Sequence, residues 1–213
     1  MKTFLMDLRT IAWRTAGARY NAARRLKQRE WFSTLSLAAL SALSIAVAFA
    51  QKTYSPTPGT ALDNYLSSLA VTFGIFLLAI SLLESGSGYG AKAEALHHNA
   101  ELLTAFQLKL AQILAQIDTG KSVTDGEVDD LRLEYEAIKD MCSCNHMPGD
   151  DALFRASKRF AKEFADGNGK PLMGWHVALL TRARWHASAF WFFGIVWILV
   201  LGSLGYSWWI PKS

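Results

Sequence analysis

Charge is missing from three long stretches of this chain of 213 residues, although 19% of its residues are charged. The stretches cover residues 32–50, 65–83 and 187–210. A helix of roughly 20 apolar residues crosses the hydrocarbon core of a bilayer, so each stretch is near the length of a transmembrane helix. A buried helix of a soluble protein rarely runs so far without a charge. The sequence therefore predicts an integral membrane protein.

Cysteine is also scarce, because Cys142 and Cys144 are the only two in the chain. Both lie in the long region between the second and third stretches. The distribution of basic residues predicts that this region is cytosolic, so no disulfide framework is expected. No Ser-His-Asp signature, paired-carboxylate motif or kinase motif set is present, and no segment alternates convincingly as a β-strand. We expect an all-α membrane protein that is not an enzyme and that binds no cofactor.

The first stretch ends in Ala48-Phe49-Ala50, which resembles a signal-peptidase site. A signal peptide has an apolar core of about 7–15 residues after a short basic start, whereas this stretch is longer and begins only after residue 31. We therefore expect a retained membrane helix. A soluble hairpin is the alternative for the first two stretches, and the tryptophan-rich third stretch argues against it.

Basic residues flank the stretches unevenly. Those before the first stretch are Lys2, Arg9, Arg14, Arg19, Arg24, Arg25, Lys27 and Arg29. The first loop carries only Lys52, and only Lys212 follows the third stretch, whereas Arg182 and Arg184 precede it. The positive-inside rule then places the N-terminus and the middle region in the cytosol and the C-terminus outside.

These patterns predict four regions. A cytosolic basic amphipathic helix covers residues 1–31, and paired transmembrane helices with a short external loop cover 32–83. A cytosolic helical hairpin or bundle covers 84–186, and a third transmembrane helix covers 187–210. The basic helix suits either the membrane surface or packing against the other cytosolic helices. The first span is rich in alanine and serine, which favours close packing within one subunit or between subunits.

The second span lacks charged residues, but several polar residues interrupt its apolar sequence. Its candidate pore-lining residues are Ser67, Ser68, Thr72, Ser81 and Glu84. Glu84 ends the span, where a carboxylate is either solvated or part of a charged ring at a pore mouth. Gly86, Gly88 and Gly90 follow at alternate positions, as in a phosphate-binding loop, but such a loop follows a β-strand. We expect these glycines to form a hinge.

A heptad pattern begins near Ala93. Its candidate seam residues are Leu96, Asn99, Leu103, Phe106 and Leu110. The pattern is typical of a helical pair, either as a coiled coil in an oligomer or as a hairpin within one chain. Asn99 is the kind of polar seam residue that fixes helix register or oligomeric state.

Cys142-Ser143-Cys144-Asn145-His146 is the most enzyme-like segment. It offers three ligands that zinc prefers, but the spacing is unusual and no fourth ligand is adjacent, although His97 and His98 precede it on a neighbouring helix. A buried Cys142 followed by a helix-ending turn is the simpler interpretation, so we predict no metal site. A nucleophilic pair of Cys144 and His146 lacks an evident orienting partner.

One combination of short motifs extends over nearly the whole chain. It comprises Trp13-Arg14-Thr15, Arg19, Ala23-Arg24-Arg25-Leu26, Leu82-Leu83-Glu84, Tyr89-Gly90, Ala93-Glu94, Leu96-His97, Tyr135 and Asn145-His146-Met147-Pro148-Gly149-Asp150. With the tight pair of spans, these motifs resemble the SLATT superfamily of prokaryotic membrane effectors. The additional third span is similar to the subfamily that occurs beside reverse transcriptases. Asp151 stands where the family pattern often has an aromatic residue.

The resemblance implies an oligomeric pore-forming effector in the bacterial inner membrane that acts in anti-phage defence by abortive infection. It also implies control by a partner, such as a reverse transcriptase, that makes or senses a nucleic-acid or nucleotide signal. No sequence-specific nucleic-acid binding by this chain is expected. Three spans enclose no useful pore alone, so this function requires a homo-oligomer. The alternative is a non-conducting membrane anchor or scaffold that recruits a soluble cytosolic partner.

Overall fold

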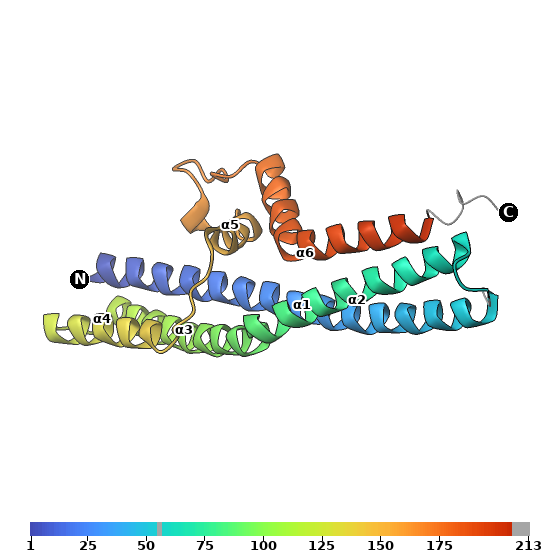
Figure 1. The fold of residues 1–213 in the computed structure, drawn as a ribbon. Coiled ribbons are helices and arrows are strands. Elements are labelled where there is room, and N and C mark those ends of the chain that lie inside the picture. Colours follow the sequence, from blue (N-terminus) through green and yellow to red (C-terminus); the bar gives the residue numbers. More distant parts are fainter. Residues whose placement is uncertain (55–56, 206–213) are drawn as a thin grey trace. The chain divides into compact units, whose positions relative to one another are not determined.

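The computed structural model describes residues 1–54 and 57–205, and every regular element in this part of the chain is helical (Figure 1). The elements are α1 (Lys2–Tyr54), α2 (Ala61–Ser87), α3 (Tyr89–Asp118), α4 (Asp125–Asp140), α5 (Pro148–Ser157), the short 3-10 helix η1 (Lys162–Phe164) and α6 (Trp175–Gly205). The predicted all-α fold is confirmed. The last residues of the predicted third span, 206–210, lie outside the described residues.

Three helical runs in the described residues are long and apolar enough to cross a membrane. They are α1, the run of α2 and α3, and α6. The predicted set of three transmembrane helices is therefore confirmed. α1 alone has 53 residues and a length of about 80 Å, more than twice the hydrocarbon thickness of a bilayer. It continues through the expected boundary at residue 31 because no proline or glycine interrupts residues 18–54.

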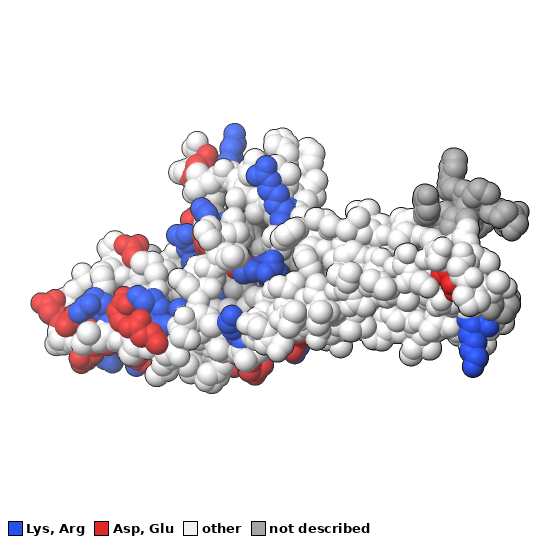
Figure 2. Space-filling view, viewed as in Figure 1, with Lys and Arg blue, Asp and Glu red and all other residues white. Residues whose placement is uncertain are grey.

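The chain divides into two compact units. We call Met1–Lys27 with Gly90–Ser188 the charged unit, and Gln28–Tyr89 with Ala189–Ser213 the apolar unit. Figure 2 shows acidic and basic side chains crowded over the surface of the charged unit, while the surface of the apolar unit is almost free of them. This distribution matches water around the first unit and lipid around the second.

The core of the charged unit joins α1, α3 and α4. Its buried members are Leu5, Leu8, Ala12 and Ala16 of α1, Leu103, Phe106, Leu110 and Leu114 of α3, and Leu131 and Tyr135 of α4. Three-to-four spacing places the α1 residues on one face of that helix. Of the two surroundings that suited the N-terminal helix, the structure therefore shows packing against other helices of the same unit.

The core of the apolar unit joins all three spans. Its buried members are Leu40 and Val47 of α1, Leu66, Leu69, Phe73 and Ile80 of α2, and Phe193, Val196 and Val200 of α6. Ser36 of α1 is buried in the same unit, whereas Ala38, Ala42 and Ala46 are exposed. The small residues of the first span thus serve packing within the chain only on one side of the helix.

Candidate functional site

The buried face of α2 is apolar and determines which of its polar residues point outward. Leu66, Leu69, Phe73 and Ile80 occupy that face. Among the candidate pore residues, Ser68 and Ser81 are exposed, and Ser67, Thr72 and Glu84 are partly buried. Ser68 and Ser81 are thirteen positions apart, which separates them by about 140° around a straight helix. The five candidates therefore do not lie on one face.

The outermost face of α2 is formed by large apolar side chains. Val71, Ile75, Leu78 and Leu82 are each about 60% exposed, at three-to-four spacing. Ser67 and Ser81 lie on one flank of this stripe, and Ser68 and Thr72 lie on the other. The chain leaves this face of α2 uncovered, so in a membrane it contacts lipid or another protein.

Hydrogen bonds between helices hold the apolar unit together at several levels. Trp197 donates from Nε1 to Ser36 Oγ at 3.1 Å, which joins α6 to α1. The hydroxyl of Tyr65 donates to the carbonyl oxygen of Ser203 at 2.7 Å, which joins α2 to α6. Hydrocarbon offers no competing partners, so such bonds fix the packing of the spans.

Gln51 adds a third polar junction, between α1 and α2. Its Nε2 donates to Asp63 Oδ1 at 2.8 Å and to Ser67 Oγ at 2.9 Å. The hydroxyl of Thr72 donates to the carbonyl oxygen of Ser68 at 2.8 Å, within α2. Ser67 thus already has a partner inside the chain, which distinguishes it from the exposed Ser68.

Glu84 faces into the apolar unit. It follows Ile80 by four positions and so continues the buried stripe of α2. Its Oε2 atom is buried and accepts no hydrogen bond from the described residues. Glu84 lines a cavity of about 270 Å³ together with Arg29 and Ser33 of α1, Tyr89, and aromatic residues of α6. A ring of carboxylates at a pore mouth requires several copies of the chain and stays a prediction.

The three candidate hinge glycines have different conformations. Gly86 lies inside α2, and Gly90 lies inside α3. Gly88 alone separates the two helices, with φ of 57° in the left-handed region that favours glycine. The interruption of the helix is one residue long, and it occurs at the central glycine of the predicted hinge.

All five candidate seam residues are buried within the charged unit. Asn99 donates from Nδ2 to the carbonyl oxygen of Ile138 at 2.6 Å. Arg19, which donates to Asn99 Oδ1, also donates from Nη2 to the carbonyl oxygen of Lys139 at 3.2 Å. These carbonyls belong to the last turn of α4, which lacks intrahelical donors and favours positive charge. The seam asparagine therefore closes a helix end inside one chain.

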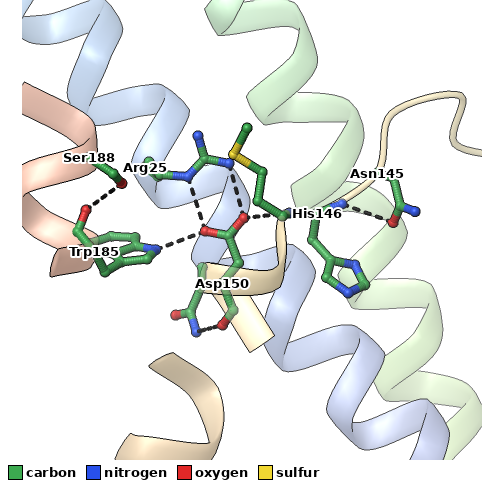
Figure 3. A network of polar contacts seen from close by, with 8 residues as sticks. Arg25, Asn145, His146, Asp150, Trp185 and Ser188 are labelled. Carbon is green, nitrogen blue, oxygen red and sulfur yellow. Dashed lines mark hydrogen bonds and ion pairs between the residues drawn. The ribbon is translucent and has the colours of Figure 1, made fainter. Parts of the chain in front are cut away.

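A second buried polar cluster surrounds Asp150 at the start of α5 (Figure 3). Asp150 is 0% exposed and accepts two hydrogen bonds from Arg25, at 3.1 and 3.0 Å. Trp185 of α6 donates from Nε1 to Oδ1 at 2.8 Å, and the amide of Met147 donates to Oδ2 at 2.9 Å. Asn21 donates to the backbone carbonyl of Asp150 at 3.0 Å. We call these five residues the Asp150 network.

The Asp150 network joins α1, α5 and α6 within the charged unit. A buried carboxylate is tolerated only when it is paired and hydrogen-bonded, and both of its oxygens meet that condition here. Sequence reasoning did not identify this cluster, because Arg25 and Asp150 are 125 positions apart. The one sequence feature that pointed to this cluster was the Asn145-to-Asp150 motif. Its aspartate holds three helices of the charged unit together by hydrogen bonds.

The cysteine–histidine segment is divided between two surroundings. Cys142 and Cys144 are free thiols that pack against Ala22, Ala23 and Leu96. His146 instead lines a different cavity, of about 360 Å³, with Arg14, Thr15 and Asp151 among its neighbours. In the part of the chain that the structure describes, no three His, Cys, Asp or Glu side chains are grouped to hold a metal ion.

The surroundings of His146 change the pKa of its imidazole. Burial lowers the pKa of its imidazole below 6.5, and the nearby positive charge of Arg19 lowers it further. The carboxylates of Asp150 and Asp151 act in the opposite direction with smaller effect. Its Nδ1 atom is buried, and none of the described residues forms a hydrogen bond with it. The surroundings of His146 therefore disfavour its protonated form.

The comparisons with known proteins give one match. The model of SMODS and SLOG-associating 2TM effector domain family 5 matches residues 1–206. No curated protein and no solved structure matches the chain significantly. The family match includes the Asp150 network, the whole charged unit and all of the described α6.

Proposed function

This chain belongs to SMODS and SLOG-associating 2TM effector domain family 5, and from that premise we propose that it is an oligomeric pore-forming effector of bacterial anti-phage defence. The resemblance to the SLATT superfamily is confirmed by the match, and the chain is a membrane effector by family. The family description specifies two transmembrane segments, whereas this chain has a third apolar helix, α6.

The uncovered outer face of α2 is the observation that carries the pore proposal. In each candidate span, only 22% of the most apolar window is buried within the chain. Three spans cannot enclose water, so conduction requires several copies. The apolar stripe of α2 supplies a contact face, and the hydroxyls on its flanks supply polar groups that can line water. Assembly then hides apolar surface and exposes Ser68 and Thr72 to the pore.

Location and control belong to the same proposal. The basic N-terminal arm favours an inner-membrane protein with a cytosolic N-terminus and an external C-terminus. The family description names association with SMODS and SLOG, and we propose a partner that makes or senses a nucleotide or nucleic-acid signal. A reverse transcriptase encoded beside the chain is our specific candidate. The partner would act on the charged unit, and Gly88 would transmit the change to α2.

The chain would act without catalysis. The two halves of the Cys144–His146 pair contact different groups, since Cys144 packs in an apolar cluster and His146 lines a polar cavity. We propose that Cys144→Ser leaves effector activity intact. Toxicity that disappears with Cys144→Ser while the protein still accumulates in the membrane would favour an enzymatic role.

Dye entry into living cells tests the proposed function. The full chain is expressed with its flanking genes, and entry of a membrane-impermeant DNA dye is followed after phage infection. A pore-forming effector admits the dye before lysis and arrests growth, and cells without the chain do neither. Growth arrest with no dye entry and no ion leakage would instead support a non-conducting anchor or scaffold that recruits a soluble partner.

A further inference from the structure

The cavity beside Glu84 combines both signs of charge with aromatic surface. α1 contributes Arg29 to its lining, α2 contributes Glu84, and α6 contributes Trp191, Phe192 and Phe193. All of these residues belong to the apolar unit. Ionisable side chains are rare among membrane helices and usually mark a functional site, and a ligand with both charged and apolar parts fits this lining best.

Glu84 supplies an acceptor that lacks a donor. Its Oε2 atom is buried, and the described residues provide no hydrogen bond to it. Such an atom is costly in a low-dielectric site unless a donor binds there. Because a carboxylate is an acceptor only, the missing partner is a donor, and an ammonium group satisfies both the hydrogen bond and the charge.

The three aromatic residues of α6 in the lining, Trp191, Phe192 and Phe193, which we call the aromatic wall, also favour a cation. The rings of Trp191 and Phe192 have centroids 6.1 Å apart, and those of Phe192 and Phe193 are 5.6 Å apart. Both pairs are edge-to-face, so ring faces and ring edges alternate along the wall. The face of an aromatic ring attracts an ammonium ion. The wall and the carboxylate of Glu84 therefore select the same kind of group.

Arg29 contributes a positive charge to the lining of the cavity. Its guanidinium lies 5.8 Å from the centroid of the Tyr89 ring. Arginine is the side chain best suited to phosphate, because its planar fork matches phosphate oxygens. A ligand that carries an ammonium group close to a phosphate therefore complements both charged side chains of the lining.

The chain places this cavity at the depth of lipid headgroups. Arg29 lies shortly before the first charge-free stretch, and Glu84 directly follows the second. Span ends of this kind lie at the interface between hydrocarbon and water. Trp191 belongs to the cavity lining and is also 60% exposed, so the cavity adjoins surface that faces lipid.

We propose that this cavity binds the headgroup of phosphatidylethanolamine. The ammonium group donates to Glu84 Oε2 and lies against the aromatic wall, while the phosphate lies beside Arg29. A volume of about 270 Å³ suits a headgroup, and the acyl chains extend along the apolar exterior. Phosphatidylcholine offers a cation without N–H donors, and phosphatidylglycerol offers no cation. The affinity of the cavity should therefore decrease from phosphatidylethanolamine to phosphatidylcholine to phosphatidylglycerol.

Native mass spectrometry of the full chain in mild detergent tests this proposal. Phosphatidylethanolamine, phosphatidylcholine and phosphatidylglycerol of identical acyl composition are added singly. One charge-assisted hydrogen bond corresponds to roughly a tenfold difference in affinity, so we expect about that preference for phosphatidylethanolamine over phosphatidylglycerol. Equal retention of the two lipids by the unmodified protein would overturn the proposal without reference to any variant.

Two variants connect the preference to the cavity. Glu84→Gln should reduce the preference to about twofold or less, because an amide offers no charge to the ammonium group. Glu94→Gln, which alters an exposed residue of α3 outside the cavity, should retain the full preference. A Glu84→Gln protein that still prefers phosphatidylethanolamine about tenfold would contradict the site. The readout is lipid retention, so a failure of pore formation would not affect the result.

Discussion

The side chain of Asp150 joins three segments of the charged unit that are far apart in the sequence. Its carboxylate accepts hydrogen bonds from Arg25 of α1, Trp185 of α6 and the backbone of Met147. Removing one partner of a buried ion pair leaves the other charge without compensation, which costs more than the pair contributes. The cluster is therefore sensitive to single substitutions.

Asp150→Asn should lower the free energy of unfolding of the charged unit by about 3–5 kcal/mol, since Arg25 would remain buried without a counter-charge. Thermal unfolding in detergent, followed by near-ultraviolet circular dichroism of the tryptophans, measures the change. The matched control is Asp129→Asn, because Asp129 pairs with Arg132 at the surface and should contribute less than about 1 kcal/mol. Equal effects of the two substitutions would show that the Asp150 network does not stabilise the fold.

His146 should make the stability of the charged unit depend on pH. Its pKa is lowered in the folded state by burial and by Arg19, so protons bind more tightly to the unfolded chain. The stability is complete above the unfolded pKa of about 6.5 and decreases as the pH falls toward the folded pKa. Unfolding temperatures measured between pH 8 and pH 5 should fall less for His146→Gln than for the unmodified protein.

A second histidine variant controls for general acid effects on this measurement. His176 lies at the exposed start of α6, so His176→Gln is the matched substitution for comparison with His146→Gln. If His146→Gln and the unmodified protein lose stability in parallel as the pH falls, protonation of His146 is not the cause.

At the scale of the elements, the junction between α2 and α3 depends on Gly88. An L-residue in its left-handed conformation costs roughly 1–2 kcal/mol, so Gly88→Ala should lower stability by about that amount. Gly86→Ala should instead raise stability by up to about 1 kcal/mol, because Gly86 is helical and none of the described atoms would lie within 4 Å of an added Cβ. Unfolding temperatures that shift in the same direction for both variants would contradict the assigned hinge position.

The two flanks of α2 should differ in their contact with water once the effector opens. Ser68 and Thr72 are four positions apart on one flank, and the opposite flank is already committed through the hydrogen bond between Gln51 and Ser67. In a chain with Cys142→Ser and Cys144→Ser, we expect Ser68→Cys and Thr72→Cys to react with a membrane-impermeant thiol reagent.

The control for this labelling experiment is Ile75→Cys, at the centre of the apolar stripe. It should remain unreactive in the same dye-permeable cells, because it would contact lipid or another subunit. Labelling of Ile75→Cys at the rate of Ser68→Cys would show that the pore is lined by a different face of α2.

Elements were easier to predict from the sequence than the contacts between them. Charge-free length is a property of local sequence, and it identified all three spans. The heptad pattern likewise identified Leu103, Phe106 and Leu110 as buried positions. By contrast, Asn99 depends on Arg19, eighty positions away, and on carbonyls at the end of α4. Nothing in the local pattern around Asn99 specifies that partner.

The positions of the candidate pore residues likewise depend on contacts that the local sequence does not specify. Composition indicated which residues of α2 are polar, but only the packing of α1 and α6 determines the face on which each one lies. Glu84 at a pore mouth stays a prediction, and within the single chain this residue lies on the buried side of α2 and lines a cavity. Its position depends on residues of α1 and α6 that approach it only in the folded chain.

At the scale of the whole molecule, the chain combines a membrane unit with a charged unit that has its own core. Three spans with 22% burial in each apolar window form a small membrane unit, whose remaining apolar surface contacts lipid or other copies of the chain. Assembly through the α2 face should produce a defined oligomer in native mass spectra of the detergent-extracted protein. A monodisperse monomer from cells undergoing phage-triggered arrest would argue against a pore built from several copies.

The membrane potential of infected cells tests the central claim most directly, because any conducting pore collapses it regardless of pore width. Cells that express the chain with its flanking genes are loaded with a potential-sensitive dye and infected with phage. We predict depolarisation that precedes lysis and that is absent from cells without the chain. A membrane potential that persists while growth stops would contradict pore formation and assign the protein to the anchor or scaffold role.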